Sequence, residues 1–517
     1  MTTTPLARPN IDPARLAALA SIVTGSAGHH EVVSPLDGRA LATLPRSNEA
    51  DVERALAAAR QAQAAWARRP LRERRAILRR AGRLFLAHQD ELLDLIQLEN
   101  GKNRLSAFEE VSDVALTAAY YARTSRRLLR PHRRRGVIPV LTSVREFRVP
   151  KGVVGIISPW NYPLMLAVAD AIPALIAGNG VVLKPDSATP LCALAAVELL
   201  RQAGVPADLV GVVVGAGSAL GPRLIDGVDY VMFTGSTATG RIIAEHCGRQ
   251  LIGCSAELGG KNPLIVLADA DIDRAAHGAV QACFSNSGQL CVSIERIYVE
   301  DAAYDAFAAA FTRRVSAMRL GVGLDWEADI GTLTSADQLA GVSAHVDDAV
   351  AKGATVLAGG KARPDIGPYV YEPTVLAGVT ADMDVARTET FGPVVSLYRV
   401  AGADEAVRLA NDSPYGLNAS VWSRRRGGDV ARRVHAGTVS VNEGYAAAWG
   451  STDAPMGGVK DSGLGRRHGD EGLLKYTEPQ SVLRQRIASV APPDRVSGET
   501  YARFMSRALA LLTRVRP

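Results

Sequence analysis

The sequence predicts an α/β protein whose two α/β domains are each built on a parallel sheet. Its 517 residues exceed the roughly 250–300 that a single hydrophobic core usually organises. From residue 152 onward, short apolar segments alternate with helical patterns. Uninterrupted apolar segments of this kind are typical of parallel strands that are buried on both faces. The alternation forms two series, which we expect to join near Glu257.

The first 130 residues are predicted to be mainly helical. A helix is expected from Asn48 to Arg68, with Asn48 as its cap and apolar residues at helical spacing. Pro70 then interrupts the chain. Further helical patterns run from Arg72 to Asn100 and from Ser106 to Leu129. These helices have polar faces and precede any strong strand.

The pattern then changes to extended segments. Val137–Val140 and Val144–Val149 flank a polar turn and predict a hairpin. The strands of the first series are expected at Gly152–Ile157, Gly180–Leu183, Leu209–Val214 and Tyr230–Phe233, with a helix at Cys192–Gly204. Those of the second series are expected at Pro263–Leu267, Arg296–Val299, Thr355–Ala358, Val394–Arg399 and Thr438–Val441.

Composition excludes several other classes of protein. The net charge of +6 is mild for this length, and the basic stretch Arg123–Arg148 is interpreted as a solvated arm and not as a nucleic-acid surface. Five cysteines without tight spacing argue against a disulfide framework and against a zinc site, so no metal is expected. Met1–Asn10 lacks the pattern of a signal peptide, and no apolar stretch reaches the ~20 residues of a membrane span. We therefore expect a cytoplasmic protein without membrane contact.

Cys291 is the first candidate for chemistry, at the end of the segment FSNSGQLC that begins at Phe284. A cysteine at a glycine-containing turn and helix start can be a nucleophile, because a helix N-terminus lowers the pKa of a thiol. The competing interpretation is a small buried hydrophobic side chain. The local sequence alone favours this second interpretation.

Two further segments suggest partners for a nucleophile. Glu257 lies in the apolar, glycine-rich AELGGKNP, where a carboxylate with a raised pKa can act as a general base; the alternative is an ion pair with Lys261. Asn161 lies in PWNYP, directly after a predicted buried strand, where open α/β sheets bind ligands. Its amide can stabilise an oxyanion, and the alternative is a turn fixed by two prolines.

Signals for a cofactor are individually weak. Lys184 follows the predicted strand Gly180–Leu183 and can bond ribose hydroxyls. The segment TGSTATG, from Thr234 to Gly240, opens a helix, and small residues at a helix start favour phosphate. It is not the G-x-G-x-x-G fingerprint, so a plain tight turn is an equal alternative.

Together these segments resemble the aldehyde dehydrogenase superfamily, over residues from Val32 to Arg486. The motifs follow the order of the family: PWNYP, LKPDS, FTGSTATG, ELGGKNP, SGQLC, ETFGP and PMGGVKDSGLG. The joint presence of SAELGGKNP, CFSNSGQLC and LKPDS is most similar to bacterial, actinobacterial-type NADP-dependent succinate-semialdehyde dehydrogenases.

The resemblance implies roles for individual residues. Cys291 is the implied nucleophile. Asn161 and the backbone amide of Cys291 are implied to form the oxyanion site. Glu257 is the implied base that activates water for thioester hydrolysis. Retention of this base favours hydrolysis over transfer to coenzyme A. The implied cofactor-binding residues are Trp160, Asn161, Lys184, Pro185, Asp186, Ser187, Gly235, Ser236, Leu258, Glu389 and Phe391. Ser187 stands where NAD-preferring relatives often carry Glu, so NADP is the expected cofactor, with NAD possible.

The resemblance also implies a Rossmann-like cofactor domain, a catalytic domain and a β arm that joins subunits into a homodimer or homotetramer. The expected boundaries are 1–124 for the N-terminal helical part of the cofactor domain, 125–147 for the arm, 148–257 for the cofactor-binding domain, 258–441 for the catalytic domain, 442–475 for the return to the cofactor domain, 476–490 for a second arm strand and 491–517 for a helical tail. In that tail Tyr501, Met505, Leu509 and Leu512 share one helical face.

The resemblance leaves the substrate open. Relatives that favour succinate semialdehyde often carry two arginines, at positions that are Ala169 and Ser285 here, and the serine of the substrate loop is missing from Tyr445-Ala446-Ala447-Ala448. The preceding Val441–Gly444 does fit that subgroup. Succinate semialdehyde is the leading expectation. The alternatives are a broad enzyme for apolar aldehydes and a silenced family member with a binding role.

Overall fold

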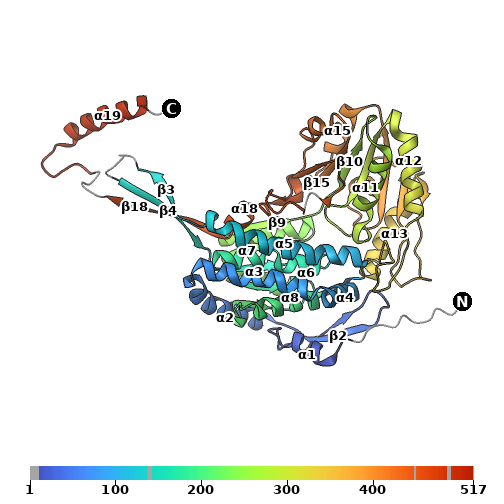
Figure 1. Ribbon diagram of the computed structural model, residues 1–517, viewed down its shortest axis with the longest axis horizontal. Helices are drawn as coiled ribbons and strands as arrows, with labels where there is room; N and C mark the ends of the chain where they lie inside the picture. Colours follow the sequence, from blue (N-terminus) through green and yellow to red (C-terminus); the bar gives the residue numbers. More distant parts are fainter. Residues whose placement is uncertain (1–10, 137–141, 447–449, 486–490, 516–517) are drawn as a thin grey trace. The chain divides into compact units, whose positions relative to one another are not determined.

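The computed structural model describes residues 11–136, 142–446, 450–485 and 491–515 (Figure 1). They fall into two compact units. Residues 1–128 and 150–477 belong to the first unit, and residues 129–149 and 478–517 belong to the second. The first unit contains two large sheets, as the alternation of strands and helices predicted.

The first sheet has six strands in the order β17-β9-β8-β5-β6-β7. Their bounds are β5 Val153–Ile157, β6 Gly180–Lys184, β7 Val210–Val212, β8 Tyr230–Thr234, β9 Gly253–Glu257 and β17 Gly463–Leu464. All neighbours are parallel except β17, which runs antiparallel to β9. The chain runs from β5 outward to β7 and then crosses to β8 on the other side of β5. The strand order therefore reverses between β5 and β8, which is where open α/β sheets bind ligands.

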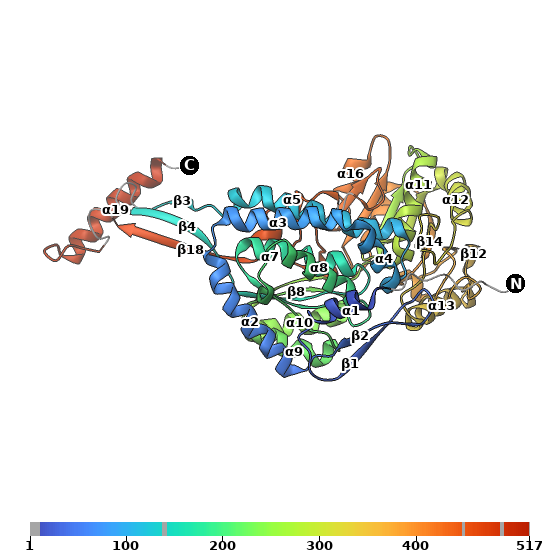
Figure 2. The same cartoon turned by 60° about the horizontal axis from the view of Figure 1, so that its bottom comes forward.

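Helices cover both faces of this sheet (Figure 2). One face carries α2 Glu49–Arg68, α9 Gly217–Gly227 and α10 Thr237–Gln250, and the other carries α3 Leu71–Ala87, α5 Arg104–Leu128, α7 Ala171–Ala177 and α8 Pro190–Gln202. As predicted, Asn48 caps α2: its side chain accepts the backbone N–H of Asp51, and the Asp51 carboxylate accepts the N–H of Asn48.

The single helix predicted over residues 72–100 is wrong, because the chain breaks at His88 into α3 and α4 Gln89–Asn100. His88 has φ −100° and ψ 20°, outside the helical range. Asp90 and Glu91 in the first turn of α4 favour a new helix start, since acidic residues interact well with a helix N-terminus. The apolar spacing continues across the break and did not reveal it.

The second sheet has seven strands in the order β12-β13-β14-β11-β10-β15-β16. Their bounds are β10 Asn262–Val266, β11 Ile294–Glu300, β12 Thr355–Ala358, β13 Thr374–Ala377, β14 Val394–Val400, β15 Asn418–Trp422 and β16 Thr438–Val441. Only β12 is antiparallel to its neighbour. Its helices are α11 Ile272–Phe284, α12 Asp301–Ser316, α13 Ala336–Ala351, α14 Asp384–Arg387, α15 Ala403–Asn411 and α16 Gly427–Ala431.

The strands β9, β13 and β15 were missed by the sequence prediction. In β15 two of the buried positions are polar, so the strand lacks an apolar run. Asn418 donates from Nδ2 to the carbonyl of Val292 at 2.9 Å, and the Ser420 hydroxyl donates to the carbonyl of Glu443 at 2.6 Å. These hydrogen bonds offset part of the cost of burying the two side chains.

The first unit also contains helices and strands outside these two sets. They are α1 Pro13–Ala20, β1 His29–Val33, β2 Ala40–Pro45, α6 Pro163–Val168 and α18 Glu471–Leu474. The chain passes from the first sheet to the second through residues 258–261, directly after Glu257. Among the described residues, no helix combines the length and apolar character needed to cross a bilayer.

The second unit contains a three-stranded sheet in the order β18-β4-β3, formed by β3 His132–Arg135, β4 Thr142–Pro150 and β18 Thr477–Gln485. The predicted strand Val144–Val149 lies within β4, whereas Val137–Val140 lies outside the described residues. The strand β4 pairs with the arginine-rich β3 on one side and with β18 on the other. Because α5 continues to Leu128, this sheet begins later than residue 125.

The predicted helical tail is also observed in this unit, as α19 Gly498–Val515. The side chain of Leu512, which we expected on its apolar face, lies outside the described part of the chain.

Candidate active site

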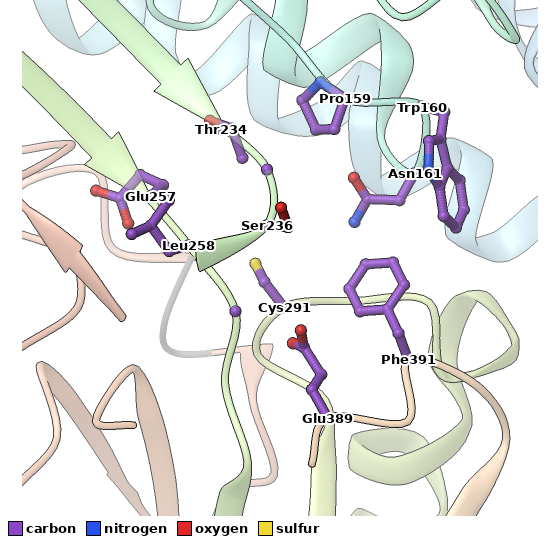
Figure 3. A pocket seen from close by; sticks show the side chains of 12 residues that line it. Pro159, Trp160, Asn161, Thr234, Ser236, Glu257, Leu258, Cys291, Glu389 and Phe391 are labelled. Carbon is purple, nitrogen blue, oxygen red and sulfur yellow. The ribbon is translucent and has the colours of Figure 1, made fainter. Parts of the chain in front are cut away.

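The ends of β5, β8 and β9 surround a cavity of about 260 Å³ (Figure 3). It lies at the reversal of strand order in the first sheet, where a ligand is expected. Most of the predicted site residues line it: Trp160, Asn161, Gly235, Ser236, Glu257, Leu258, Cys291, Glu389 and Phe391. Lys184, Pro185, Asp186 and Ser187 are not on this wall, since they follow the neighbouring strand β6.

The loop that carries the thiol is held in a constrained backbone conformation. After α11 ends at Phe284, Asn286 and Ser287 adopt φ of 50° and 55°, a region that few residues other than glycine occupy. The N–H of Asn286 donates to the Ser106 hydroxyl at 3.0 Å, and its side-chain amide donates to the Asn161 carbonyl at 2.9 Å. Surrounding contacts therefore maintain the strained turn, as is common near functional sites.

Gly288 lets this turn pack against the segment 389–393. A Cβ at Gly288 would lie 2.1 Å from the carbonyl oxygen of Gly392, which is far inside van der Waals contact. Its φ of 72° also favours glycine. The glycine of SGQLC is thus needed for backbone packing, and it fixes the position of Cys291 three residues later.

The expectation that a helix start lowers the pKa of Cys291 is wrong. The neighbouring helix α11 ends before this residue, and Cys291 lies in a turn that leads into β11. Burial, together with the negative charges of Glu257 and Glu389, raises the pKa of the Cys291 thiol to about 12. The thiol is therefore protonated at neutral pH, and a base must remove its proton before attack.

Glu257 is the last residue of β9 and is only 3% exposed. Neither of its carboxyl oxygens has a hydrogen-bond partner within the described residues, and burial raises the pKa of Glu257 to about 7. In Figure 3 the carboxyl group is turned away from the thiol. The alternative pairing with Lys261 is wrong, because Lys261 forms an ion pair with Glu295.

A buried charge cluster that the sequence analysis missed adjoins Glu257. An Arg467 guanidinium nitrogen lies 2.5 Å from the carboxylate of Asp170 and 3.1 Å from the hydroxyl of Thr234. Thr234 is paired with Glu257 across β8 and β9. The Arg467 charge opposes the effect of burial on the pKa of Glu257. Arg467 follows the SGLG motif, and nothing in that stretch signals its burial.

Asn161 is held by contacts on both its backbone and its side chain. Its carbonyl accepts a hydrogen bond from the ammonium of Lys102 at 2.7 Å. Its amide nitrogen donates to the carbonyl of Gln289 at 3.1 Å, and Figure 3 shows the amide facing the cavity that contains Cys291. A primary amide has two N–H donors, so one N–H remains for a ligand in the cavity.

The residues at the cofactor end fit a dinucleotide. Ser236 caps α10, its hydroxyl accepting the N–H of Thr239 at 3.3 Å, and the N-terminus of this 14-residue helix opens at the cavity. Unpaired N–H groups and the helix dipole favour an anion such as pyrophosphate at that position. The TGSTATG segment therefore begins a helix, as the interpretation of a phosphate-binding helix start requires.

Glu389 reaches the same cavity because of a glycine. A Cβ at Gly259 would lie 2.4 Å from a carboxyl oxygen of Glu389, so a side chain there would displace it. The other oxygen accepts the N–H of Gly260 at 2.8 Å. Nearby, the rings of Trp160 and Phe391 meet edge-to-face with centroids 5.5 Å apart. These residues form a wall with one carboxyl group that suits ribose hydroxyls.

The segment Lys184–Ser187 lies at the end of β6, beside the end of β5. Lys184 is 5% exposed, and its ammonium donates to the Pro185 carbonyl at 3.2 Å. His30 of β1, which the sequence analysis did not identify, donates from Nε2 to the Ser187 carbonyl at 2.6 Å. This contact fixes the backbone of the segment from a distant part of the chain.

A second, smaller cavity of about 40 Å³ shares Asn161 and Cys291 with the first and extends away from the cofactor residues. Its other lining residues include apolar side chains and a few polar ones: Glu109, Asp113, Tyr162, Met165, Leu166, Leu290, Val292, Tyr445, Met456, Arg467 and His468. Ala169 is buried elsewhere, as the C-cap of α6. Ala447 and Ala448 of the predicted substrate loop lie outside the described residues.

The environment of the other thiols predicts that mild oxidation leaves no reversible disulfide at Cys291. Cys283 is buried in the core and Cys254 packs with Cys247 under α10, and Ser293 stands two residues after Cys291. Treatment with peroxide followed by non-reducing mass spectrometry should show Cys291 unlinked. A Cys291–Cys283 or Cys291–Cys254 peptide would contradict this.

Within the described ranges, no group of three or more metal-binding side chains is present.

Comparisons with known proteins show the family of this chain. The model of the aldehyde dehydrogenase family matches residues 22–482. A Mycolicibacterium smegmatis protein named "Putative succinate-semialdehyde dehydrogenase (NADP+)" is 54% identical over 498 residues, 96% of each chain. A Mycobacterium tuberculosis protein with the same name, numbered 2, is 56% identical over 458 residues, 88% of each chain.

The fold is shared with solved structures as well. An "NADP dependent enzyme" of E. coli is 37% identical, with a TM-score of 0.85, covering 89% of this chain and 95% of its own. The family model covers most of the chain, and the motifs that line the cavity are those on which the resemblance rested. This chain belongs to the aldehyde dehydrogenase family, the oxidoreductases that act on aldehydes.

Proposed function

We propose that this chain oxidises succinate semialdehyde to succinate, with NADP as its preferred cofactor. The observation that carries the chemistry is that Cys291, Glu257 and Asn161 line one cavity beside the start of α10. The substrate and the cofactor are suggested by the names of the two mycobacterial relatives, which are more than half identical to this chain.

In the proposed mechanism the Cys291 thiol gives up its proton to water, and its sulfur adds to the aldehyde carbon. The free N–H of Asn161 and the backbone N–H of Cys291 stabilise the resulting oxyanion. When bound, the oxidised nicotinamide supplies the hydride acceptor. Loss of hydride leaves a thioester on Cys291. Glu257 then takes a proton from water, which attacks the thioester and releases the carboxylic acid.

Ser236 and the N-terminus of α10 would bind the pyrophosphate, and Glu389 would bind a ribose hydroxyl. Lys184 and Ser187 would meet the adenosine ribose, where NADP carries its 2′-phosphate. The Ser187 hydroxyl is neutral and can donate to a phosphate oxygen, and Lys184 adds a positive charge. This combination lacks a repulsive carboxylate, so NADP is preferred and NAD remains acceptable.

Ser187→Glu tests this preference. A carboxylate beside the 2′-phosphate is expected to raise the KM for NADP at least about tenfold, equivalent to ~1.4 kcal/mol, while the KM for NAD changes much less. Steady-state kinetics with both cofactors measures the effect. Ser187→Ala is the matched control, since it removes a neutral hydroxyl without adding charge. Equal effects of Ser187→Glu on both cofactors, or a wild type that strongly prefers NAD, would contradict the assignment.

The proposed function itself is tested by assaying the purified full chain against an aldehyde panel with NAD and NADP. Succinate semialdehyde is expected to give the highest kcat/KM with NADP. A preference for butanal and longer alkanals would favour the alternative of a broad enzyme, which is suggested by Met165, Leu166 and Leu290 in the smaller cavity. No turnover of any aldehyde would favour a silenced family member.

We further propose a homo-oligomer in which the sheet of β3, β4 and β18 pairs with another subunit, as the family resemblance implies. A reducing cytoplasm suits the chain, since all five cysteines are free thiols.

A further inference from the structure

The smaller cavity contains a carboxyl group that the mechanism does not use. Glu109 of α5 lines it together with Tyr162 and Tyr445. The Tyr162 hydroxyl donates to one carboxyl oxygen of Glu109 at 3.2 Å, and the Tyr445 hydroxyl donates to the other. Ser285 extends the chain, with its hydroxyl oxygen 2.7 Å from that of Tyr445. Two tyrosine hydroxyls from separate parts of the chain therefore converge on one carboxyl group, and Ser285 supports one of them.

The charges around Glu109 do not supply it with a cation. Within the described ranges, no lysine, arginine or histidine lies at ion-pair distance from Glu109. The positive charge of Lys102 lowers the pKa of Glu109, but the Lys102 ammonium lies 2.7 Å from Glu110, with which it pairs. The other titratable groups of the surrounding elements are Glu110, Asp113, Tyr162, Glu443, Tyr445, Arg467 and His468. Burial raises the pKa of Glu109 in spite of its tyrosine partners, which favours the neutral acid.

We propose that the carboxyl group of Glu109, with the hydroxyls of Tyr162 and Tyr445, binds the distal carboxylate of the aldehyde substrate. Two carboxyl groups that share a buried site retain one proton between them, because both cannot be ionised at low cost. The shared proton then forms a charge-assisted hydrogen bond, and the tyrosine hydroxyls can turn to the substrate oxygens. This inference rests on the proposed function and names how its substrate is recognised.

The proposal accounts for the absence of arginines at the positions that the family resemblance suggested. Ala169 is buried as a helix cap and does not line the cavity. Ser285 contributes a hydroxyl to the Tyr445–Glu109 chain. Arg467 does reach the cavity, but its guanidinium is held by Asp170 and Thr234. A hydroxyl and carboxylic-acid site therefore takes the place of a cationic one.

The site makes recognition of the substrate depend on pH. Glu109 must be protonated when the substrate carboxylate binds, so binding takes up one proton wherever Glu109 is ionised in the free enzyme. The kcat/KM for succinate semialdehyde, divided by that for uncharged butanal, should then fall up to about tenfold per pH unit as pH rises through the pKa of Glu109. The ratio removes contributions of Cys291 and Glu257, which both substrates share.

Two variants of Glu109 separate this proposal from simple repulsion. Glu109→Gln keeps a hydrogen-bond donor without titration, so the substrate ratio should stay within a few-fold of the wild-type maximum and lose the pH dependence of the wild type. Glu109→Leu removes the donor, so the ratio should fall at least about tenfold at the pH of the wild-type maximum while butanal oxidation continues. Repulsion by an ionised Glu109 predicts the opposite result, a higher ratio in Glu109→Leu, and that result would overturn the proposal.

Further outcomes complete the test. Glu99→Gln is the matched control, because it neutralises another buried carboxyl group with a raised pKa that does not line the cavity; it should leave the pH dependence of the ratio in place. A wild-type ratio that does not vary with pH, or a preference for cationic betaine aldehyde over succinate semialdehyde, would overturn the Glu109 site while leaving aldehyde oxidation intact. Absence of turnover with every aldehyde would instead contradict the proposed function.

Discussion

The Cys291→Ala variant is expected to lose aldehyde oxidation by at least about 10⁴-fold, since removal of a covalent nucleophile eliminates the pathway and not merely a favourable contact. NADP binding should change little. Burial keeps the Cys291 thiol neutral, so alanine replaces one small uncharged side chain with another and leaves the charges around the cofactor unaltered. The fold should be unaffected, because Cys291 is only partly buried at the cavity wall.

Formation of NADPH, followed at its absorbance maximum, measures the loss, and a fluorescence titration measures cofactor affinity. Cys254→Ala is the control: this thiol is also partly exposed but lies on β9 away from the cavity lining. It should retain normal turnover. Near wild-type activity in Cys291→Ala would reject the covalent mechanism.

Glu257→Gln is expected to slow steady-state turnover by about 10²–10⁴-fold, the usual contribution of a general base, while the first turnover still releases NADPH as a burst. Thioester hydrolysis needs the base, whereas hydride transfer does not. In the wild type the hydrolysis rate should rise with pH through about 7, because burial raises the pKa of Glu257 to about 7 and only its ionised form, above that pH, accepts a proton. The variant should lose this dependence.

Stopped-flow measurement of NADPH between pH 6 and 9 resolves the burst from the steady rate. Asp113→Asn is a demanding control, since burial also raises the pKa of Asp113 to about 7; it should keep the wild-type pH profile. A slow rate without a burst would assign Glu257 to deprotonation of the Cys291 thiol. An unchanged steady rate would exclude Glu257 as the base for hydrolysis.

The sequence alone determined the α/β class and the two parallel sheets, which depend on local pattern. Its motifs identified most residues at the main cavity through their resemblance to the family. Apolar runs such as Val153–Ile157 are fully buried strands, and small residues around Ser236 begin a helix. Asn161 follows β5 and Glu257 ends β9, so the parallel order of the first sheet brings them to one edge, and the turn before β11 of the second sheet places Cys291 at the same cavity.

Only the tertiary structure decided the electrostatics of the site. The sequence suggested a helix N-terminus that would activate Cys291, but the chain makes a turn there and burial raises the pKa of the thiol. Likewise, nothing near Glu109 or Arg467 in the sequence indicates that each is buried beside the cavity. The physical reason is that desolvation and charge pairing depend on which distant groups become neighbours: Asp170 for Arg467, and Tyr162 and Tyr445 for Glu109. Periodicity along the chain indicates which face of a helix or strand is buried, but it does not indicate which residues that face contacts.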